Sequence, residues 1–243
     1  MAGKIKITKQ FIISQTILYV FIMAFVITFR MIFGDKNILK DFNLELDNCK
    51  INCLIGESGR GKSTILNLIS GLLKPDSGEI IGASKEKVSY IFQEDRLLPW
   101  LTVYENIELA LSKYYSKDEL KEKIDYVLKK VNGGEWKDVY PGKLSGGMRQ
   151  RVNIARALGK PSDIILMDEP FKSLDYKTKY SIMKEFKNIF LNDHRIVVFV
   201  THDVDECIYF KGKVIVVSGT PLSIKGVFNE NLEKHKEEII NLL

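Results

Sequence analysis

The stretch "GESGRGKST", Gly56–Thr64, decides the fold because it matches the spacing G-x-x-x-x-G-K-[ST]. Its glycines allow the backbone to wrap closely with N–H groups pointing inward. The apolar run at residues 50–54 predicts a strand before it, and "KSTILNLIS" predicts a helix after it. The positive N-terminal end of that helix faces the same point as the loop. A strand, a glycine-rich turn and a helix in this order predict a site for the phosphates of a nucleoside triphosphate.

All nine residues of this loop are expected to contact the nucleotide. They are Gly56, Glu57, Ser58, Gly59, Arg60, Gly61, Lys62, Ser63 and Thr64. The Lys62 ammonium can reach the β- and γ-phosphates, and the Ser63 hydroxyl is placed to bind Mg²⁺. The loop alone does not separate kinases, GTPases and ATPases.

A second motif, "DIILMDEP" at Asp163–Pro170, is a short apolar run followed by two carboxylates. Such a run is typical of a strand buried on both faces of a parallel sheet, with its acids at the carboxyl edge. Asp168 is suited to the Mg²⁺ shell, opposite Ser63. Glu169 points to the other side of the strand, where it could orient or deprotonate the attacking water.

A third apolar run, residues 196–200, leads into "THD", so His202 also reaches the carboxyl edge of the sheet. A lone histidine is more often structural than catalytic, but the end of a strand is where parallel sheets carry their sites. The sequence therefore predicts an α/β fold with a mainly parallel sheet.

The class is indicated by "LSGGMRQR", residues 144–151, which resembles the signature of the ATP-binding-cassette (ABC) ATPases. Its small residues predict a helix N-terminus with open backbone donors, which is a second anion-binding end. The resemblance implies that two cassettes pair head to tail and that each signature closes over the ATP on its partner. The implied signature contacts are Leu144, Ser145, Gly146, Gly147, Met148, Arg149 and Gln150.

Other positions of this family follow in order, and the resemblance covers about residues 36–228. Gln93 resembles the glutamine that senses Mg²⁺ and the transport domain. "SLD", which is Ser173, Leu174 and Asp175, resembles the loop across the dimer interface. His202 matches the switch histidine at the γ-phosphate. The resemblance implies ATP and Mg²⁺ as cofactors, an antiparallel β subdomain, and a helical subdomain that carries the signature.

The helical subdomain is expected at about residues 94–160 within an ATPase domain of residues 31–228, with a C-terminal helix at 229–243. Between Gln93 and the signature, "DELKEKIDYVLKKV" has helical periodicity. The residues that share its apolar face are Leu120, Ile124, Val127, Leu128 and Val131.

The segment "RLLPWLTVYENI", residues 96–107, offers an apolar patch directly after Gln93. Its sequence is similar to that of importer cassettes for nitrate, aliphatic sulfonates and taurine. On this resemblance the patch would receive a helix from a membrane permease, at the cytoplasmic face of the membrane. The implied function is ATP hydrolysis that powers uptake of a small solute, with a second copy of the chain, permease subunits and a solute-binding protein as partners.

Two other classes compete with this reading. A soluble cassette ATPase that acts on nucleic acid or ribosomes usually has two cassettes or long inserted arms, whereas this chain has one cassette and no room for arms. The mild net charge of +5 is also not gathered into basic runs. We therefore expect no nucleic-acid partner. A cassette that binds ATP without turnover is opposed by the presence of Lys62, Asp168, Glu169 and His202.

The three cysteines, Cys49, Cys53 and Cys207, lack metal-ligand spacing. We expect buried or free thiols of a reducing compartment.

The stretch "FIISQTILYVFIMAFVITF", residues 11–29, has no charged side chain and is long enough to cross a bilayer. Three readings stay open: a membrane-associated or spanning helix, a non-functional extension, and a segment packed on the cassette. Residues 1–30 are accordingly set apart as an extension. The family needs an aromatic residue that stacks on adenine, and Phe33 is preferred to Phe11 because its spacing to the loop at Gly56 is undisturbed.

Overall fold

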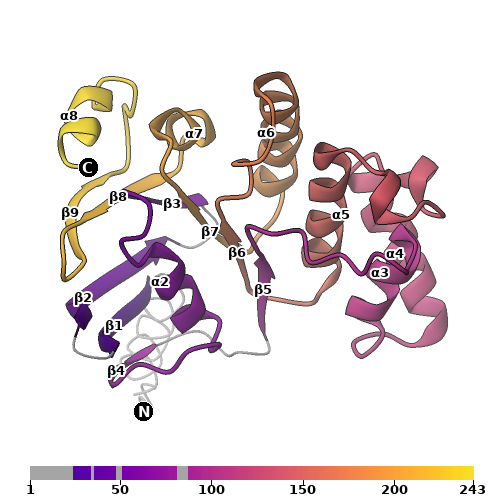
Figure 1. Ribbon diagram of the computed structural model, residues 1–243, viewed down its shortest axis with the longest axis horizontal. Coiled ribbons are helices and arrows are strands. Elements are labelled where there is room, and N and C mark those ends of the chain that lie inside the picture. The colour runs from indigo at the N-terminus through magenta and orange to yellow at the C-terminus, as the bar shows by residue number, and fades with distance from the viewer. Residues whose placement is uncertain (1–23, 34–35, 48–50, 81–86) are drawn as a thin grey trace, which may run out of the picture.

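The computed structural model describes residues 24–33, 36–47, 51–80 and 87–243. Figure 1 shows two sheets flanked by helices. The strands are β1 (Ala24–Phe33), β2 (Lys36–Asp47), β3 (Ile51–Ile55), β4 (Ser77–Ile80), β5 (Val88–Ile91), β6 (Ile164–Asp168), β7 (Ile196–Thr201), β8 (Lys213–Ser218) and β9 (Ser223–Phe228). The α-helices are α2 (Lys62–Ile69), α3 (Val103–Leu111), α4 (Lys117–Lys130), α5 (Gly146–Gly159), α6 (Tyr176–Leu191), α7 (Val204–Phe210) and α8 (Lys236–Asn241). Two 3₁₀ turns, Gly134–Trp136 and Pro141–Lys143, precede α5.

The larger sheet has the strand order β5-β6-β7-β3-β8-β9. All of its neighbouring strands run parallel except the last pair, in which β9 is antiparallel to β8. The α/β fold with a mainly parallel sheet is therefore confirmed.

Both faces of this sheet are buried, which explains the uninterrupted apolar runs of its strands. On one face Ile165 and Met167 of β6 belong to a core built with α3 to α7. On the other face Ile164 and Leu166 pack with α2 and β2. Alternate residues of one strand thus anchor two separate layers.

The smaller sheet is antiparallel, with the order β2-β1-β4. β1 pairs with β2 from Ala24 opposite Asp47 to Phe33 opposite Lys36. The expected boundary between residues 30 and 31 therefore falls inside a strand.

The reading of residues 11–29 as one membrane helix is wrong for its last six residues, because these form the first part of β1. Valine, isoleucine, phenylalanine and threonine favour strands, and pairing with β2 satisfies their backbone groups. Residues 11–23 of this stretch, and Phe11 with them, lie outside the described residues. In the part of the chain that the structure describes, no helix is long and apolar enough to span a bilayer.

Helices α3, α4 and α5 are grouped at one end of the molecule, away from the antiparallel sheet (Figure 1). The five residues predicted on the apolar face of α4 and its C-cap are all buried. The C-terminal segment, expected as a helix over residues 229–243, is helical only at α8.

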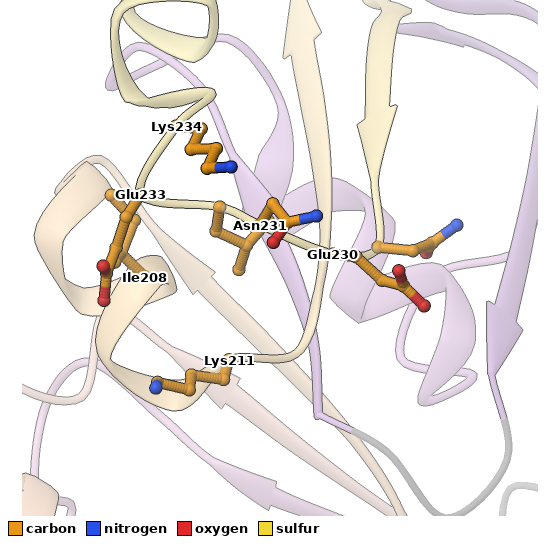
Figure 2. Close-up of a pocket in the computed structure, with 8 residues that line it drawn as sticks. Ile208, Lys211, Glu230, Asn231, Glu233 and Lys234 are labelled. Atoms are coloured by element: carbon orange, nitrogen blue, oxygen red, sulfur yellow. The ribbon is translucent and has the colours of Figure 1, made fainter.

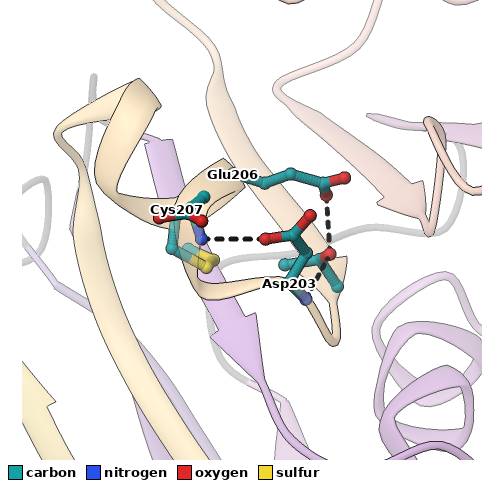
Figure 3. The surroundings of a disulfide bond; sticks show 6 residues. Asp203, Glu206 and Cys207 are labelled. Carbon is teal, nitrogen blue, oxygen red and sulfur yellow. Dashed lines mark hydrogen bonds between the residues drawn. A yellow bond between two sulfur atoms is a disulfide. The ribbon is translucent and has the colours of Figure 1, made fainter. Parts of the chain in front are cut away.

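Cys53 on β3 and Cys207 on α7 are joined by a disulfide, with a Cα–Cα distance of 5.8 Å (Figure 3). The expectation of free thiols is wrong for this pair, although both residues are buried as expected. The two cysteines are 154 residues apart, and the packing of α7 on β3 brings them together. Cys49 lies outside the described residues.

Candidate functional site

The loop Gly56–Thr64 wraps around its own lysine. Lys62 is the first residue of α2 and is buried, and its Nζ donates hydrogen bonds to Gly56 O at 2.7 Å and Glu57 O at 2.8 Å. Burial lowers the pKa of this ammonium, although Glu169 and Asp168 act in the opposite direction. The lysine is therefore fixed across the base of the loop, at the positive end of the helix.

Two glycines of the loop are required by the geometry. Gly61 is the N-cap of α2 with φ 104°, which is left-handed backbone that side chains disfavour. A Cβ on Gly56 would lie 2.4 Å from Val217 O of strand β8. The loop thus turns as tightly as the sequence pattern predicts.

A cleft of about 560 Å³ opens in front of this loop. Among the predicted nucleotide contacts, Ser58 through Thr64 line it, and Gln93 and Glu169 join them from other segments. The remaining lining residues are Ile38, Lys172, Gly219, Thr220 and Leu222. The structure therefore brings the loop, the glutamine and the second acid of the "DIILMDEP" motif to one place.

Asp168 ends β6 on the inner side of this region. Its carboxylate is buried, and Tyr90 Oη donates to its Oδ2 at 3.5 Å. Burial raises the pKa of Asp168, and the neighbouring Ser63 side chain opposes that rise.

The donor set around Asp168 fits Mg²⁺. Within the described residues, Asp168 Oδ1 is buried without a hydrogen-bond partner. Gln93 lines a hollow with Asp168 as well as the main cleft. A carboxylate, a hydroxyl and an amide oxygen beside a phosphate cradle are the ligands that Mg²⁺ takes, since it uses few protein oxygens and completes its shell with phosphate and water. Asp168, Ser63 and Gln93 would hold the ion.

Glu169 follows Asp168 with φ 43°, a conformation rare outside glycine. Its side chain is 8% exposed and forms an ion pair of 2.6 Å with Lys172 Nζ. Burial by itself would raise the pKa of Glu169, but the ion pair with Lys172, with smaller contributions from His202 and Lys62, outweighs it and lowers the pKa. Glu169 is therefore held ionised at the wall of the cleft.

His202 lies beside Glu169, with its Nδ1 3.5 Å from Glu169 Oε1. The imidazole is half exposed, and it is not among the residues that line the cleft. Two of the predicted catalytic side chains thus meet just beyond the ends of β6 and β7.

The signature segment lies apart from this cleft in the described chain, and none of its residues lines the cleft. Ser145 is the N-cap of α5 and its Oγ accepts from Met148 N at 3.2 Å. Arg149 donates to Asp95 Oδ2 at 2.5 Å and to Leu144 O at 2.8 Å, which ties α5 to the segment after Gln93. The two glycines at residues 146 and 147 open the helix, and the second packs closely on α6.

The loop Ser173–Asp175 lies directly before α6 and also outside the cleft lining. Asp175 is the N-cap of α6, and its Oδ1 accepts from Thr178 N at 3.1 Å. Leu174 is half-buried and packs on the core, while Ser173 is exposed.

Phe33 ends β1, and its side chain lies outside what the structure describes. Its strand partner is Lys36, and Ile38, two residues further along β2, lines the cleft. The end of this hairpin is thus close in sequence to a wall of the cleft.

Several residues of the site could not be predicted from the sequence. Lys172 lies between the "DIILMDEP" and "SLD" motifs. No sequence pattern predicts its ion pair with Glu169. Tertiary packing brings three more residues to the site: Tyr90 from β5, Ile38 from β2 and Thr220 from the β8–β9 turn. No local sequence pattern predicts this packing.

The apolar patch after Gln93 is partly exposed. Pro99 and Trp100 face solvent, with Trp100 68% exposed, whereas Leu97 packs against the core. The buried amide of Asn106 holds this turn, since it donates to Leu98 O and to the carbonyl of residue 101 and accepts from Leu98 N. The exposed tryptophan is therefore presented by a fixed turn.

Another hollow, of about 270 Å³, lies between α7 and the segment after β9 (Figure 2). Its charged side chains are balanced, two lysines (Lys211, Lys234) and two glutamates (Glu230, Glu233). It has no glycine-rich loop and receives no residue of the predicted motifs, so we assign it no ligand.

The matching family model is described as ABC transporter and covers residues 39–172. The aliphatic sulfonates import ATP-binding protein SsuB of Bacillus thuringiensis subsp. konkukian is 40% identical over an alignment of 207 residues, which covers 82% of this chain and 81% of that protein.

Solved structures agree in fold. CbiO1 of Clostridium perfringens, part of an ABC transporter complex, superposes with a TM-score of 0.79 at 24% identity, over 90% of this chain and 93% of that one. A dimeric ATP-binding cassette in a post-hydrolysis state, bound to ADP and Pi, superposes with a TM-score of 0.71 at 31% identity, over 85% of this chain and 98% of that one.

Proposed function

This chain belongs to the ABC transporter family of ATP-hydrolysing proteins, and we propose that it is the ATPase subunit of an importer for a small anionic solute such as an aliphatic sulfonate. The observation that carries the proposal is the 40% identity with a sulfonate import protein over 82% of the chain. On this proposal the solute is recognised by the permease and by a solute-binding protein, and the cleft of this chain serves ATP alone.

ATP is the substrate, with its phosphates on the loop Gly56–Thr64. Phe33 at the end of β1 is proposed to stack on adenine, near Ile38 in the cleft wall. Asp168, Ser63 and Gln93 would hold Mg²⁺, which supplies charge stabilisation to the phosphates when it is bound.

Glu169 is proposed as the general base. It is ionised, lines the cleft, and is held by Lys172 at 2.6 Å. His202, 3.5 Å from the Glu169 carboxylate, is proposed to contact the γ-phosphate. The two side chains would bracket the attacking water.

A second copy of the chain is proposed to complete the site. The helix N-terminus at Ser145–Gly147 offers backbone donors, yet it lies outside the cleft of its own chain. A head-to-tail pair would place this N-terminus and the loop Ser173–Asp175 over the partner's nucleotide. The dimeric cassette of similar fold supports the pairing of two copies.

The surface at Trp100 is proposed as the docking site for a permease, which would place the chain at the cytoplasmic face of the membrane. A large apolar side chain held in the open by a buried asparagine is typical of an interaction surface. It lies a few residues after Gln93, so movement of the permease could reach the cleft.

Glu169→Gln is expected to keep ATP affinity while lowering the turnover rate by roughly 10²–10⁴, the usual contribution of a general base. Turnover and the dissociation constant for ATP would be measured on the same preparation. Glu233→Gln, in the hollow beside α7, is the matched control and should hydrolyse ATP at the normal rate. A normal rate in Glu169→Gln would remove Glu169 from this role.

Ser145→Arg is expected to abolish hydrolysis without weakening ATP binding by the isolated chain, because the bulky cation blocks the partner's nucleotide only. Ser116→Arg, at the N-cap of α4, is the control for the loss of a helix cap. If Ser145→Arg lowers the ATP affinity of the monomer, the signature acts within its own chain and the dimer model is wrong.

The importer assignment is tested by purifying the tagged chain from native membranes in mild detergent. A membrane permease should co-purify with the chain, and Trp100→Ala should lose it. Leu191→Ala, which removes an equally exposed apolar side chain on α6, should retain it. Recovery of ribosomes or DNA in place of a permease would contradict the assignment.

A further inference from the structure

Lys179 lies in the first turn of α6, one turn after the loop Ser173–Asp175. Its backbone N–H donates to Asp175 O at 2.8 Å. Its side chain is 17% exposed, which is unusual for a lysine on a helix, and it reaches the residues around His202. No sequence pattern singled it out.

The Lys179 ammonium contacts two carboxylates. Its Nζ lies 2.6 Å from Asp203 Oδ2 and also pairs with Glu206 Oε1. Glu206 is on α7 and is 5% exposed, whereas Asp203 is the N-cap of the same helix. One partly buried cation therefore joins the start of α6 to the start of α7.

Thr201 closes this arrangement into a ring. Its Oγ1 donates to Glu206 Oε2 at 2.6 Å and accepts from Asp203 N at 3.1 Å (Figure 3). Thr201 and Asp203 are the two chain neighbours of His202. Both residues that flank the histidine are thus held in one network with Lys179.

The charges of the ring make Lys179 its essential member. Burial raises the pKa of Glu206, and the hydrogen bonds from Lys179 and Thr201 oppose that rise. Without the ammonium, two adjacent carboxylates would face each other in a partly buried site, which is strongly unfavourable. Asp203 would keep its cap bond from Asp205 N at 2.9 Å but lose its tie to α6, so the backbone at His202 would no longer be fixed to that helix.

We propose that Lys179 is a positioning residue for hydrolysis, which fixes His202 through Asp203 and couples it to the loop before α6. The inference rests on the proposed role of His202 at the γ-phosphate. Since the loop Ser173–Asp175 is proposed to lie at the dimer interface, the same ring would let the partner chain sense or set the position of the histidine.

The test is ATP hydrolysis by the full-length chain carrying Lys179→Met, which keeps most of the length of the side chain and removes its charge. We expect kcat to fall roughly 10-fold to 100-fold, the scale of a misplaced catalytic group, with the KM for ATP within about twofold because the phosphate loop is untouched. Lys179→Arg should restore most of kcat. A normal kcat in Lys179→Met would overturn the proposal.

Lys187→Met is the matched control. Lys187 is on the same helix and also binds α7, since its Nζ donates to Tyr209 O at 2.6 Å, but it touches none of the ring. It should hydrolyse ATP at the normal rate. An equal loss of kcat in both variants would show that only the attachment of α6 to α7 matters, and would overturn the proposal.

A double variant separates positioning from folding. Lys179→Met combined with Glu206→Gln removes the unpaired buried charge, and the amide oxygen that replaces the carboxylate can still accept from Thr201. Thermal stability should therefore return while Asp203 stays detached from α6, and we expect kcat to remain low. Recovery of kcat together with stability would show a merely structural role and overturn the proposal.

His202→Ala distinguishes this inference from the role on which it rests. If Lys179 acts through His202, adding Lys179→Met to His202→Ala should not lower the rate further. The single variant His202→Ala and the combination His202→Ala with Lys179→Met should then have the same low rate. Losses that multiply would overturn the inference and leave the role of His202 standing. A normal rate in His202→Ala alone would remove the role of His202, and the inference with it.

Discussion

Parallel pairing of β7 with β3 on one side and with β6 on the other is the constraint on which the site depends. Ile55 of β3 is in register with Thr201 of β7, and Asp168 of β6 is in register with Val200. The phosphate loop, Glu169 and His202 each begin one residue beyond the end of these strands. Three segments that are far apart in sequence therefore reach one edge of the sheet, as the topology of parallel α/β folds requires.

The charges at this edge are controlled by burial and by single partners. Lys62 is enclosed by its own loop, and Glu169 is kept ionised mainly by Lys172. Asp168 retains one buried oxygen without a partner among the described residues. A preorganised set of this kind is suited to phosphate chemistry, where positioning and electrostatics provide most of the catalysis.

Patterns with a strong local cause were predictable from the sequence. Strands β6 and β7 were found because burial on both faces gives a continuous apolar run. The apolar face of α4 was found because burial of one side of a helix gives apolar residues at helical spacing. The loop at Gly56 was found because its glycines are required by the backbone.

Features that arise from tertiary contact were not predictable. The apolar composition of residues 11–29 is compatible with a helix or with a strand. For residues 24–29, pairing with β2 decides in favour of the strand. The disulfide between Cys53 and Cys207 joins residues 154 positions apart. Lys172 and Lys179 are ordinary lysines in sequence, and only the fold places them beside the buried carboxylates of Glu169 and Glu206.

The central claim is that the phosphate loop of one copy and the signature helix of another form a single ATP site. The most direct measurement is the distance from Ser145 Oγ to the nearest γ-phosphate oxygen in an experimental structure of Glu169→Gln bound to ATP and Mg²⁺. A shared site predicts a hydrogen-bond distance to the ATP held by the partner copy. Contact with the ATP of its own chain, or no contact with ATP at all, would contradict it.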